Sequence, residues 1–299
     1  MATEHAPTTE PAIQPSSRID LHTHSNHSDG LQAPAALVAE ASRRGLSVLG
    51  LTDHDTVAGI PEAASAAGAA GIDLIPGVEL SAGGPDHEIH ILGYFVDPTD
   101  QAFIAALARL AARRVDRAER IVERLGAIGV PVTLARVRDL AGTGSIGRPH
   151  VARAMIEAGH VADVAEAFDR FLGSGRPGFV PRARFTPTEA VGLLLANRAV
   201  PVFAHPLTSG DIEATLRLLV PLGLRGMEVY YGEYDPETRD RLRAIADRWE
   251  LVPTGGSDYH GPGFKPGREL GAPIVPMECV TRLRLAHARL GAETNHDRR

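Results

Sequence analysis

Short apolar segments that are each followed at once by a histidine, an aspartate or a glutamate recur along this 299-residue chain. The first is Ile19–Leu21, which precedes His22 and His24. On an extended chain alternate side chains share one face, so we expect both imidazoles to point in the same direction. A His-x-His pair at the C-terminal end of a strand, with a carboxylate such as Asp29 nearby, suits a metal site. The pair alone is weak evidence, because two histidines in a polar loop give the same pattern.

The pattern of strands and helices predicts parallel βα units, whose functional sites form at the C-terminal ends of the strands. In the first third of the chain we expect strands at Ile19–Leu21, Val48–Thr52, Asp73–Val78 and His87–Tyr94, and helices at Pro34–Arg44 and Ile60–Ala70. After Pro187 we expect strands at Val200–Ala204, Gly226–Tyr230 and Leu251–Thr254, again separated by helices. The fold class is therefore α/β.

Between Asp100 and about Arg184 the pattern changes to helices without a strand that ends in an ionisable residue. We interpret this segment as a helical insertion. The predicted organisation is a disordered tail at 1–17, a metal-binding α/β part at 18–99 and 185–290, the insertion at 100–184 and a tail at 291–299. Four arginines fall on one face of the first inserted helix, with acidic residues among them, so we expect a solvated, ion-paired face. They are Arg113, Arg117, Arg120 and Arg124.

The ionisable residues at the predicted strand ends form one set of candidate metal ligands. They are His22, His24, Asp29, His54, Glu79, His90, His205, Asp258 and His260. Each has an ordinary explanation by itself, but loop composition alone does not place a ligand at so many strand ends. The single cysteine, Cys279, leaves nothing for a cysteine-type zinc site.

Charge and composition restrict the partners and the location. A net charge of -6 and a pI of about 6.1 argue against an extended nucleic-acid surface, although a local basic pocket stays open. The first 17 residues lack a basic start and an apolar core, so they do not resemble a signal peptide. No apolar run is long enough to span a bilayer, and we therefore predict a soluble cytoplasmic protein without a membrane partner.

Six short motifs, in this order, resemble the motif set of the PHP (polymerase and histidinol phosphatase) superfamily. They are His22-Thr-His24 with Ser28-Asp29-Gly30, Thr52-Asp-His54-Asp55, Gly77-Val-Glu79, His90-Ile-Leu-Gly93, Ala204-His205-Pro206 and Gly256-Ser-Asp258-Tyr-His260. The resemblance covers the α/β part of the chain. It implies a distorted seven-stranded (β/α) barrel with three divalent metal ions in its mouth.

The resemblance also implies how the ligands are shared among the ions. One ion would be held by His22, His24, Glu79 and Asp258, a second by Glu79, His90 and His205, and a third by Asp29, His54 and His260. Asp53 and Asp55 are candidates for orienting these ligands through hydrogen bonds. Mn²⁺ is the first choice from the family, and the donor types suit Zn²⁺ or Fe²⁺ equally.

Two further motifs, Gly147-Arg148-Pro149-His150 and Phe179-Val-Pro-Arg182, resemble those of one branch of the superfamily. This branch contains stand-alone enzymes similar to 3′,5′-nucleoside bisphosphate phosphatases. Some members of that branch are 5′-to-3′ exonucleases on short RNA. The resemblance implies that Arg148, His150 and Arg182 bind phosphate, and a guanidinium can bind phosphate through two parallel hydrogen bonds. The alternative is that Arg148 forms a cap or an ion pair within the insertion.

The predicted activity is hydrolysis of the 3′-phosphate of nucleoside 3′,5′-bisphosphates, extending to short 5′-phosphorylated RNA, by a hydroxide that the metal ions generate. The partner is thus a phosphorylated nucleotide or a short RNA end. The leaving group would be protonated by metal-bound water or by His205. The alternatives are a phosphatase of the histidinol-phosphate type or for another small molecule, an amide hydrolase, and a non-enzymatic, metal-stabilised accessory module.

Overall fold

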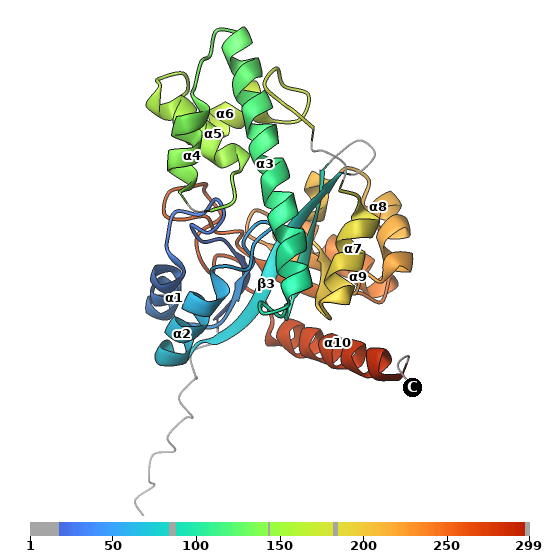
Figure 1. Cartoon of the computed structure of the whole chain (residues 1–299). Coiled ribbons are helices and arrows are strands. Elements are labelled where there is room, and N and C mark those ends of the chain that lie inside the picture. The colour runs from blue at the N-terminus through green and yellow to red at the C-terminus, as the bar shows by residue number, and fades with distance from the viewer. Residues whose placement is uncertain (1–17, 84–87, 143, 182–184, 297–299) are drawn as a thin grey trace, which may run out of the picture.

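The seven strands of the protein form a nearly closed barrel. The computed structural model describes residues 18–83, 88–142, 144–181 and 185–296. Its strands follow one another in sequence order: β1 Arg18–Thr23, β2 Leu46–Leu51, β3 Asp73–Gly83, β4 Glu88–Tyr94, β5 Val200–Phe203, β6 Gly226–Tyr231 and β7 Val252–Gly256. The first and last strands meet where the His24 amide donates to the Tyr259 carbonyl at 2.9 Å. The predicted distorted (β/α)7 barrel is confirmed (Figure 1).

One strand departs from the predicted parallel arrangement. Neighbouring strands are parallel in β1–β2–β3 and in β5–β6–β7, but β4 is antiparallel to both β3 and β5. Residues 84–87 are all that separates β3 from β4, and a parallel crossover needs a dozen residues or more. Because β4 runs backwards, His90 near its start lies at the edge where the parallel strands end.

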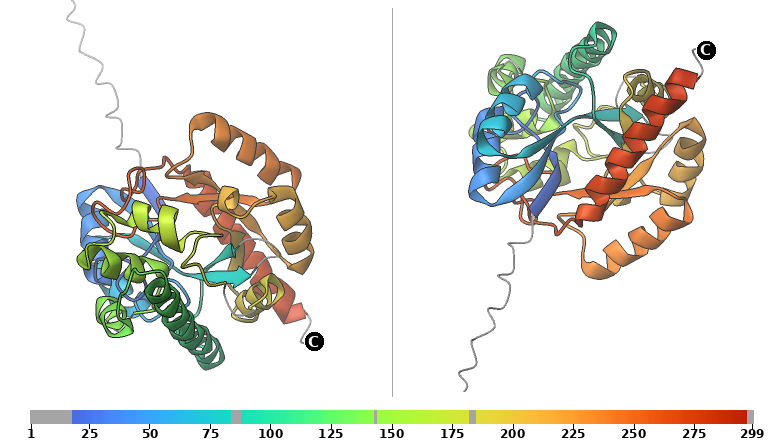
Figure 2. Two further views of the ribbon diagram at one scale, coloured as in Figure 1. Left: turned by 90° about the horizontal axis from the view of Figure 1, so that it is seen from above. Right: turned by 90° about the horizontal axis from the view of Figure 1, so that it is seen from below.

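Helices surround the barrel and one helix closes its far end. The surrounding helices are α1 Pro34–Arg43, α2 Ile60–Ala70, α7 Pro187–Ala196, α8 Ile212–Leu219 and α9 Pro236–Arg248, with short 3-10 turns at Pro206–Thr208 and Val220–Leu222. The last helix, α10 Met277–His296, lies across the end of the barrel opposite the insertion (Figure 2). Its Cys279 and Leu283 belong to the same buried apolar cluster as Leu21 and Val202 of the strands. That end is therefore filled by apolar side chains, which leaves the other end for a polar site.

The inserted segment contains helices joined by loops and no strand among its described residues. These are α3 Gln101–Ala127, α4 Leu134–Ala141, α5 Arg148–Glu157 and α6 Val164–Ala167, which continues into a π-helical turn at Phe168–Leu172. The side chain of Asp100 begins α3 by accepting hydrogen bonds from two backbone amides. The first half of α3 packs on the barrel through Phe103 and Leu107, and its second half packs in a separate core through Ile121 and Leu125. In Figure 1, α3 rises along the barrel and carries the other inserted helices above it.

The predicted solvated arginine face of α3 is wrong for Arg117. Its side chain is buried, its Nε donates to the Val180 carbonyl at 2.8 Å, and its guanidinium pairs with Glu88 at 3.1 Å. Arg114, outside the predicted face, is also buried and pairs with Asp55. Arginine spacing marks one helix face, but it does not show which face meets the barrel.

The sequence predicts a tail at each end of the chain. The predicted tail at 1–17 lies outside the described residues, whereas α10 continues through residues 291–296 of the predicted C-terminal tail. Across the residues that the structure describes, no helix combines the length and the apolar character that a membrane crossing requires.

Candidate metal centre

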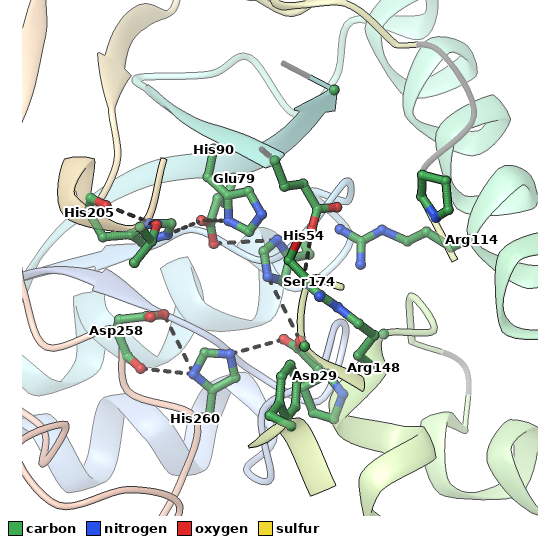
Figure 3. Close-up of a pocket in the computed structure, with 18 of the residues that line it drawn as sticks. Asp29, His54, Glu79, His90, Arg114, Arg148, Ser174, His205, Asp258 and His260 are labelled. Atoms are coloured by element: carbon green, nitrogen blue, oxygen red, sulfur yellow. Dashed lines mark hydrogen bonds and ion pairs between the residues drawn. The ribbon is translucent and has the colours of Figure 1, made fainter. Parts of the chain in front are cut away.

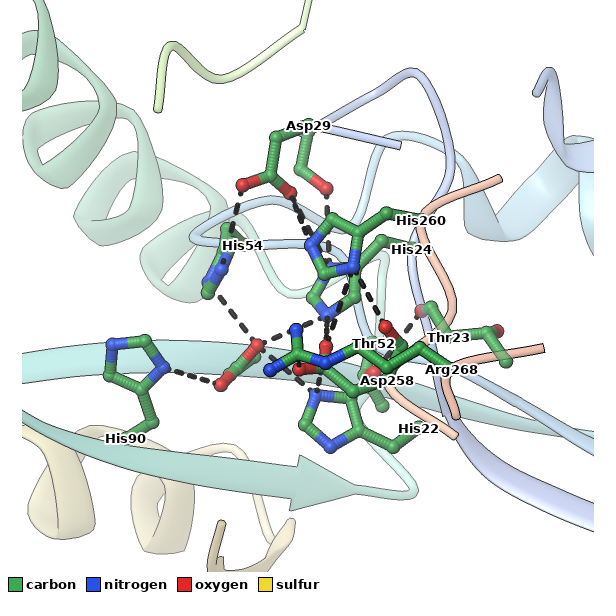
Figure 4. Close-up of polar contacts among 12 residues, drawn as sticks. His22, Thr23, His24, Asp29, Thr52, His54, His90, Asp258, His260 and Arg268 are labelled. Carbon is green, nitrogen blue, oxygen red and sulfur yellow. Dashed lines mark hydrogen bonds and ion pairs between the residues drawn. The ribbon is translucent and has the colours of Figure 1, made fainter. Parts of the chain in front are cut away.

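All nine candidate ligands converge at one end of the barrel, where the carboxylate of Glu79 lies among them. Figure 4 shows His24, Asp29, His54, Asp258 and His260 directed toward one another there. Five imidazoles approach the two oxygens of Glu79. The distances are 3.2 Å from His22 Nε2, 3.1 Å from His24 Nε2 and 3.4 Å from His54 Nδ1 to Oε2, and 2.6 Å from His90 Nδ1 and 3.0 Å from His205 Nε2 to Oε1. Such crowding of one carboxylate fits a group that bridges cations.

Two further carboxylates complete the arrangement. Asp258 Oδ1 lies 3.1 Å from His24 Nε2 and 3.4 Å from His22 Nε2. Asp29 Oδ1 lies 3.3 Å from His260 Nε2, and its Oδ2 lies 3.8 Å from His54 Nε2. Three groups of potential ligand atoms result, with all atoms of a group within 4.8 Å of one another: His22, His24, Glu79 and Asp258; His24, Asp29, His54 and His260; and His54, Glu79 and His90.

Several atoms in these groups are buried without a hydrogen-bond partner. Among the described residues they include His24 Nε2, Asp29 Oδ1 and His54 Nδ1. Leaving a buried polar atom unsatisfied costs about 1–3 kcal/mol. A divalent cation coordinated by these atoms would remove that cost, so the residues present fit a metal centre.

The pKa values show what a cation would displace. Burial opposes ionisation of Glu79, but His54 and His90 hold its pKa well below the usual range. Burial likewise opposes protonation of His24, but Asp258 and Glu79 raise its pKa to about 10. The metal-free centre therefore keeps a proton on His24 at neutral pH, and metal binding must release it.

A cavity of about 990 Å³ opens above these ligands, between the barrel and the insertion (Figure 3). Arg148 lines its inserted side. The guanidinium of Arg148 pairs with Glu88 at 2.7 Å and lies over the rings of Phe168 and Phe179, 5.4 and 5.9 Å from their centroids. The cavity thus has carboxylates and imidazoles on one side and an arginine held against aromatic rings on the other.

Known proteins resemble this chain in sequence and in fold. Residues 20–135 match the model of the PHP domain family. The chain is 35% identical over 259 residues to a 3′,5′-nucleoside bisphosphate phosphatase of Chromobacterium violaceum. This alignment covers 85% of this chain and 90% of the relative. The chain belongs to the PHP domain family. It is also 35% identical over 262 residues to the 5′-3′ exoribonuclease Rnm of Escherichia coli, covering 85% and 89% of the two chains.

A solved PHP-type structure supports the same assignment. A crystal structure from Bifidobacterium adolescentis, assigned as a metal-dependent phosphoesterase, superimposes with a TM-score of 0.82 at 32% sequence identity. The match covers 91% of this chain and 97% of that chain. The likeness therefore includes the inserted helices as well as the barrel.

The two aspartates beside the PHP motif residue His54 act on the backbone and on the insertion. Asp53 accepts hydrogen bonds from the amide and hydroxyl of Ser25 at 2.7 and 2.6 Å and from Ser28 Oγ at 2.6 Å. It thereby fixes the loop that carries His24 and Asp29. Asp55 pairs with Arg114 of α3, so it joins this PHP loop to the insertion.

Three residues of this PHP site adopt a backbone conformation that side chains other than glycine rarely take. The φ angles are 53° at Asp55, 24° at His205 and 54° at Asp258. Such conformations cost on the order of 1–3 kcal/mol each and cluster at functional sites. The fold holds His205 in place through its amide, which donates to Glu228 Oε2 at 2.7 Å.

His150, another predicted phosphate ligand, is not among the residues that line the cavity. His150 is 1% exposed, and its Nδ1 accepts a hydrogen bond from the Gly147 amide at 3.0 Å. Burial lowers its pKa to about 4, so the ring is neutral. It therefore supports the turn that presents Arg148, and its contact with phosphate stays a prediction. Arg182 lies outside the described residues.

Sequence reasoning missed three charged residues of the PHP site. Glu228 contacts His22 Nδ1 at 3.1 Å, Arg268 contacts Asp258 at 2.7 Å, and Arg114 lines the cavity. The glutamate was detectable, because a carboxylate inside an apolar strand such as β6 needs a buried partner. The two arginines carry no such local signal. The partner of Arg114 is 59 residues away in the sequence, and the partner of Arg268 lies in the preceding motif.

Proposed function

We propose that this protein removes the 3′-phosphate of nucleoside 3′,5′-bisphosphates, and that short 5′-phosphorylated RNA is a second substrate. The chain is a metal-dependent hydrolase of phosphoric esters, as its PHP relatives are. The observation that carries the narrower proposal is one cavity with the ligand set on the barrel side and Arg148 on the inserted side. A substrate with two phosphates can occupy both sides at once.

We infer that three divalent ions, Mn²⁺ first among them, bind the nine ligands. The three overlapping ligand groups and the buried atoms without partners support this number. The first group equals the first ligand set that the family resemblance implies, while His24 and His54 each occur in two groups. Divalent cations held there would lower the pKa of a water and neutralise phosphoryl oxygens.

The protein's own residues would orient the ester. Arg148 donates to Glu88 and to the Leu172 carbonyl, and on substrate entry its guanidinium can exchange these contacts for hydrogen bonds to the phosphate that is not cleaved. Its guanidinium is already positioned by Glu88 and two phenylalanine rings, which reduces the entropy lost when substrate binds. The barrel ligands would hold the reacting phosphate in the same cavity, so that the ester bond lies between the two anchors.

His205 is better suited to a ligand role than to proton transfer. Its Nε2 lies 3.0 Å from Glu79 Oε1, and its Nδ1 lies 2.8 Å from Thr208 Oγ1. Both ring nitrogens therefore have partners, and neither is directed at a substrate oxygen without first leaving one. We accordingly assign protonation of the leaving group to water.

The size of the cavity favours RNA as the second substrate. Its volume of about 990 Å³ lies at the upper end of the range of roughly 300–1,000 Å³ that is typical of small-molecule pockets. That space accommodates more than one nucleotide. A 5′-phosphorylated end could then place its terminal phosphate at Arg148 and its first internal linkage at the barrel ligands.

The first experiment measures phosphate released from adenosine 3′,5′-bisphosphate by Mn²⁺-loaded protein. Adenosine 5′-monophosphate and histidinol phosphate are the matched control substrates, and a short 5′-phosphorylated RNA is tested in parallel with products resolved by mass. We expect phosphate and adenosine 5′-monophosphate from the bisphosphate, and mononucleotides from the RNA. Preferred hydrolysis of histidinol phosphate, or equal phosphate release from adenosine 5′-monophosphate, would overturn the assignment.

A further inference from the structure

The loop that follows β7 places the guanidinium of Arg268 against a candidate metal ligand, Asp258. After His260 the chain crosses the end of the barrel, and Arg268 from this loop contacts Asp258. The loop packs closely on the turn after β6, because a Cβ atom added at Gly232 would lie 2.2 Å from the Gly267 carbonyl oxygen. Arg268 thus reaches Asp258 from a segment whose backbone lies directly against the turn after β6.

The two oxygens of Asp258 have different surroundings. Oδ1 faces His22 and His24, at 3.4 and 3.1 Å from their Nε2 atoms. Oδ2 points away from that group, and it accepts a hydrogen bond from the Tyr231 hydroxyl at 2.9 Å and pairs with Arg268 Nη1 at 2.7 Å. Only one oxygen is therefore available to a cation in the group of His22, His24, Glu79 and Asp258.

Arg268 is itself held in a single orientation. Its Nε donates to Glu233 Oε1 at 2.5 Å, and its guanidinium lies 5.4 Å from the centroid of the Tyr231 ring. Its side chain is 17% exposed. With its planar donors divided between two carboxylates, it is placed to orient Asp258 rather than to bind a substrate phosphate.

We propose that Arg268 is a positioning residue that fixes Asp258 with one oxygen directed at the metal group and thereby sets the affinity for the cation held there. A carboxylate without this partner could rotate and offer either oxygen or both, so its favourable geometry would be lost part of the time. Partners of this kind usually contribute 10- to 100-fold to metal affinity. The inference rests on the proposed metal ligands of this site and is independent of the substrate.

The chain offers a matched control in Lys265. It pairs with the other oxygen of Glu233 at 2.7 Å, and it does not contact Asp258. K265Q and R268Q therefore remove the same charge from the same loop and the same glutamate, but only R268Q removes a partner of Asp258. R268K keeps the charge and loses the planar geometry.

The experiment is a Mn²⁺ titration of metal-free protein by calorimetry, with the bound metal counted after dialysis. In R268Q we expect one class of Mn²⁺ site to weaken by about 10- to 100-fold, in R268K by less, and in K265Q not at all. The melting temperature in EDTA reports whether each variant folds, and if R268Q does not fold, R268K decides. Wild-type Mn²⁺ affinity in the folded arginine variants would overturn the proposal.

Activity measurements separate this inference from the proposed function. With saturating Mn²⁺ we expect kcat of R268Q to recover toward the wild-type value. A raised KM for the nucleotide with unchanged metal affinity would instead make Arg268 a substrate contact and refute the positioning role. If wild-type protein binds Mn²⁺ but does not cleave the bisphosphate, the proposed function fails while the metal titration still tests Arg268.

Discussion

The barrel edge and the inserted helices contribute to the same cavity in different ways. On the barrel, short side chains such as Asp29, Glu79 and His90 are placed by strands and by tight loops. On the insertion, the long side chain of Arg148 reaches the cavity from a helix and is positioned by Glu88 and by aromatic rings. Backbone-defined geometry suits metal ligands, whose distances vary little, while a long arginine suits substrates of varied shape. The division predicts that metal binding and substrate binding can be disrupted separately.

The largest effect is expected from Glu79→Gln, on the barrel side. The carboxylate contacts five imidazoles, so its loss should remove bound metal and at least about 4 kcal/mol of transition-state stabilisation, a thousand-fold in kcat. Metal analysis and steady-state kinetics measure both. Glu228→Gln is the control, since that glutamate is equally buried but faces the far nitrogen of His22. This substitution should lower kcat by only about 10- to 100-fold. Equal effects in the two variants would contradict the central role of Glu79.

The next effect concerns the junction between the two regions. In Asp55→Asn the buried guanidinium of Arg114 loses its charged partner, which should lower the free energy of unfolding by about 3 kcal/mol. The matched control is Glu157→Gln, which breaks the half-exposed pair with Arg136 and should cost less than about 1 kcal/mol. Urea unfolding in EDTA compares them. Similar costs would show that the Asp55–Arg114 pair does not anchor the insertion.

A substitution on the inserted side should spare the metals. Arg148→Ala is expected to lower kcat/KM for the bisphosphate by about 100-fold, because the lost hydrogen bonds are charge-assisted, while the bound Mn²⁺ stays at the wild-type level. Arg148→Lys should recover only part of this loss, because an ammonium lacks the planar donor pair. Arg136→Ala, at an exposed inserted arginine, is the control and should behave as wild type. A variant of Arg148 with full activity would remove it from the substrate site.

A change of pH, tenfold in effect per unit, also separates the two regions. The carboxylates around His24 raise its pKa to about 10 in the metal-free protein, so a bound cation has to displace its proton. The apparent Mn²⁺ affinity should therefore rise by about tenfold per pH unit for each displaced proton as pH increases from 6 to 9. The guanidinium of Arg148 does not titrate in this range, so KM at saturating Mn²⁺ should change little on its account. Mn²⁺ titrations and KM measurements at several pH values test both expectations. A Mn²⁺ affinity that does not change with pH would contradict the displacement of a proton from His24.

Local sequence signals were sufficient for most of the barrel edge because most of the ligands lie at or shortly after the end of an apolar segment. The end of an apolar segment places His22 or Glu79 without knowledge of the other strands, and family-like spacing then supplies the rest. The direction of β4 was the exception. It depended on the four residues between β3 and β4, which are too few for a crossover, and not on the apolar pattern within β4.

The inserted side was less predictable because its interactions join distant segments. The arginines on α3 follow a helical spacing that fits exposure and burial equally well, and Arg117 turned out to face Val180 and Glu88. Arg268 follows the last motif in sequence, but its role depends on a loop that returns to Asp258. Neither secondary-structure propensity nor helical periodicity shows which distant segments come into contact.

Helix α3 connects the two cores rigidly, so a small change of angle at one end displaces the other end. Its 27 residues span about 40 Å, with Phe103 near the end that packs on the barrel and Leu125 near the end that carries the other inserted helices. A tilt of about 5° at the barrel end would move the far end by roughly 3 Å, about the length of a hydrogen bond. Packing beneath Phe103, remote from the ligands, thus contributes to the alignment of Arg148. A Phe103→Leu variant should accordingly raise KM before it changes the amount of bound metal, and kinetics paired with metal analysis would show whether it does.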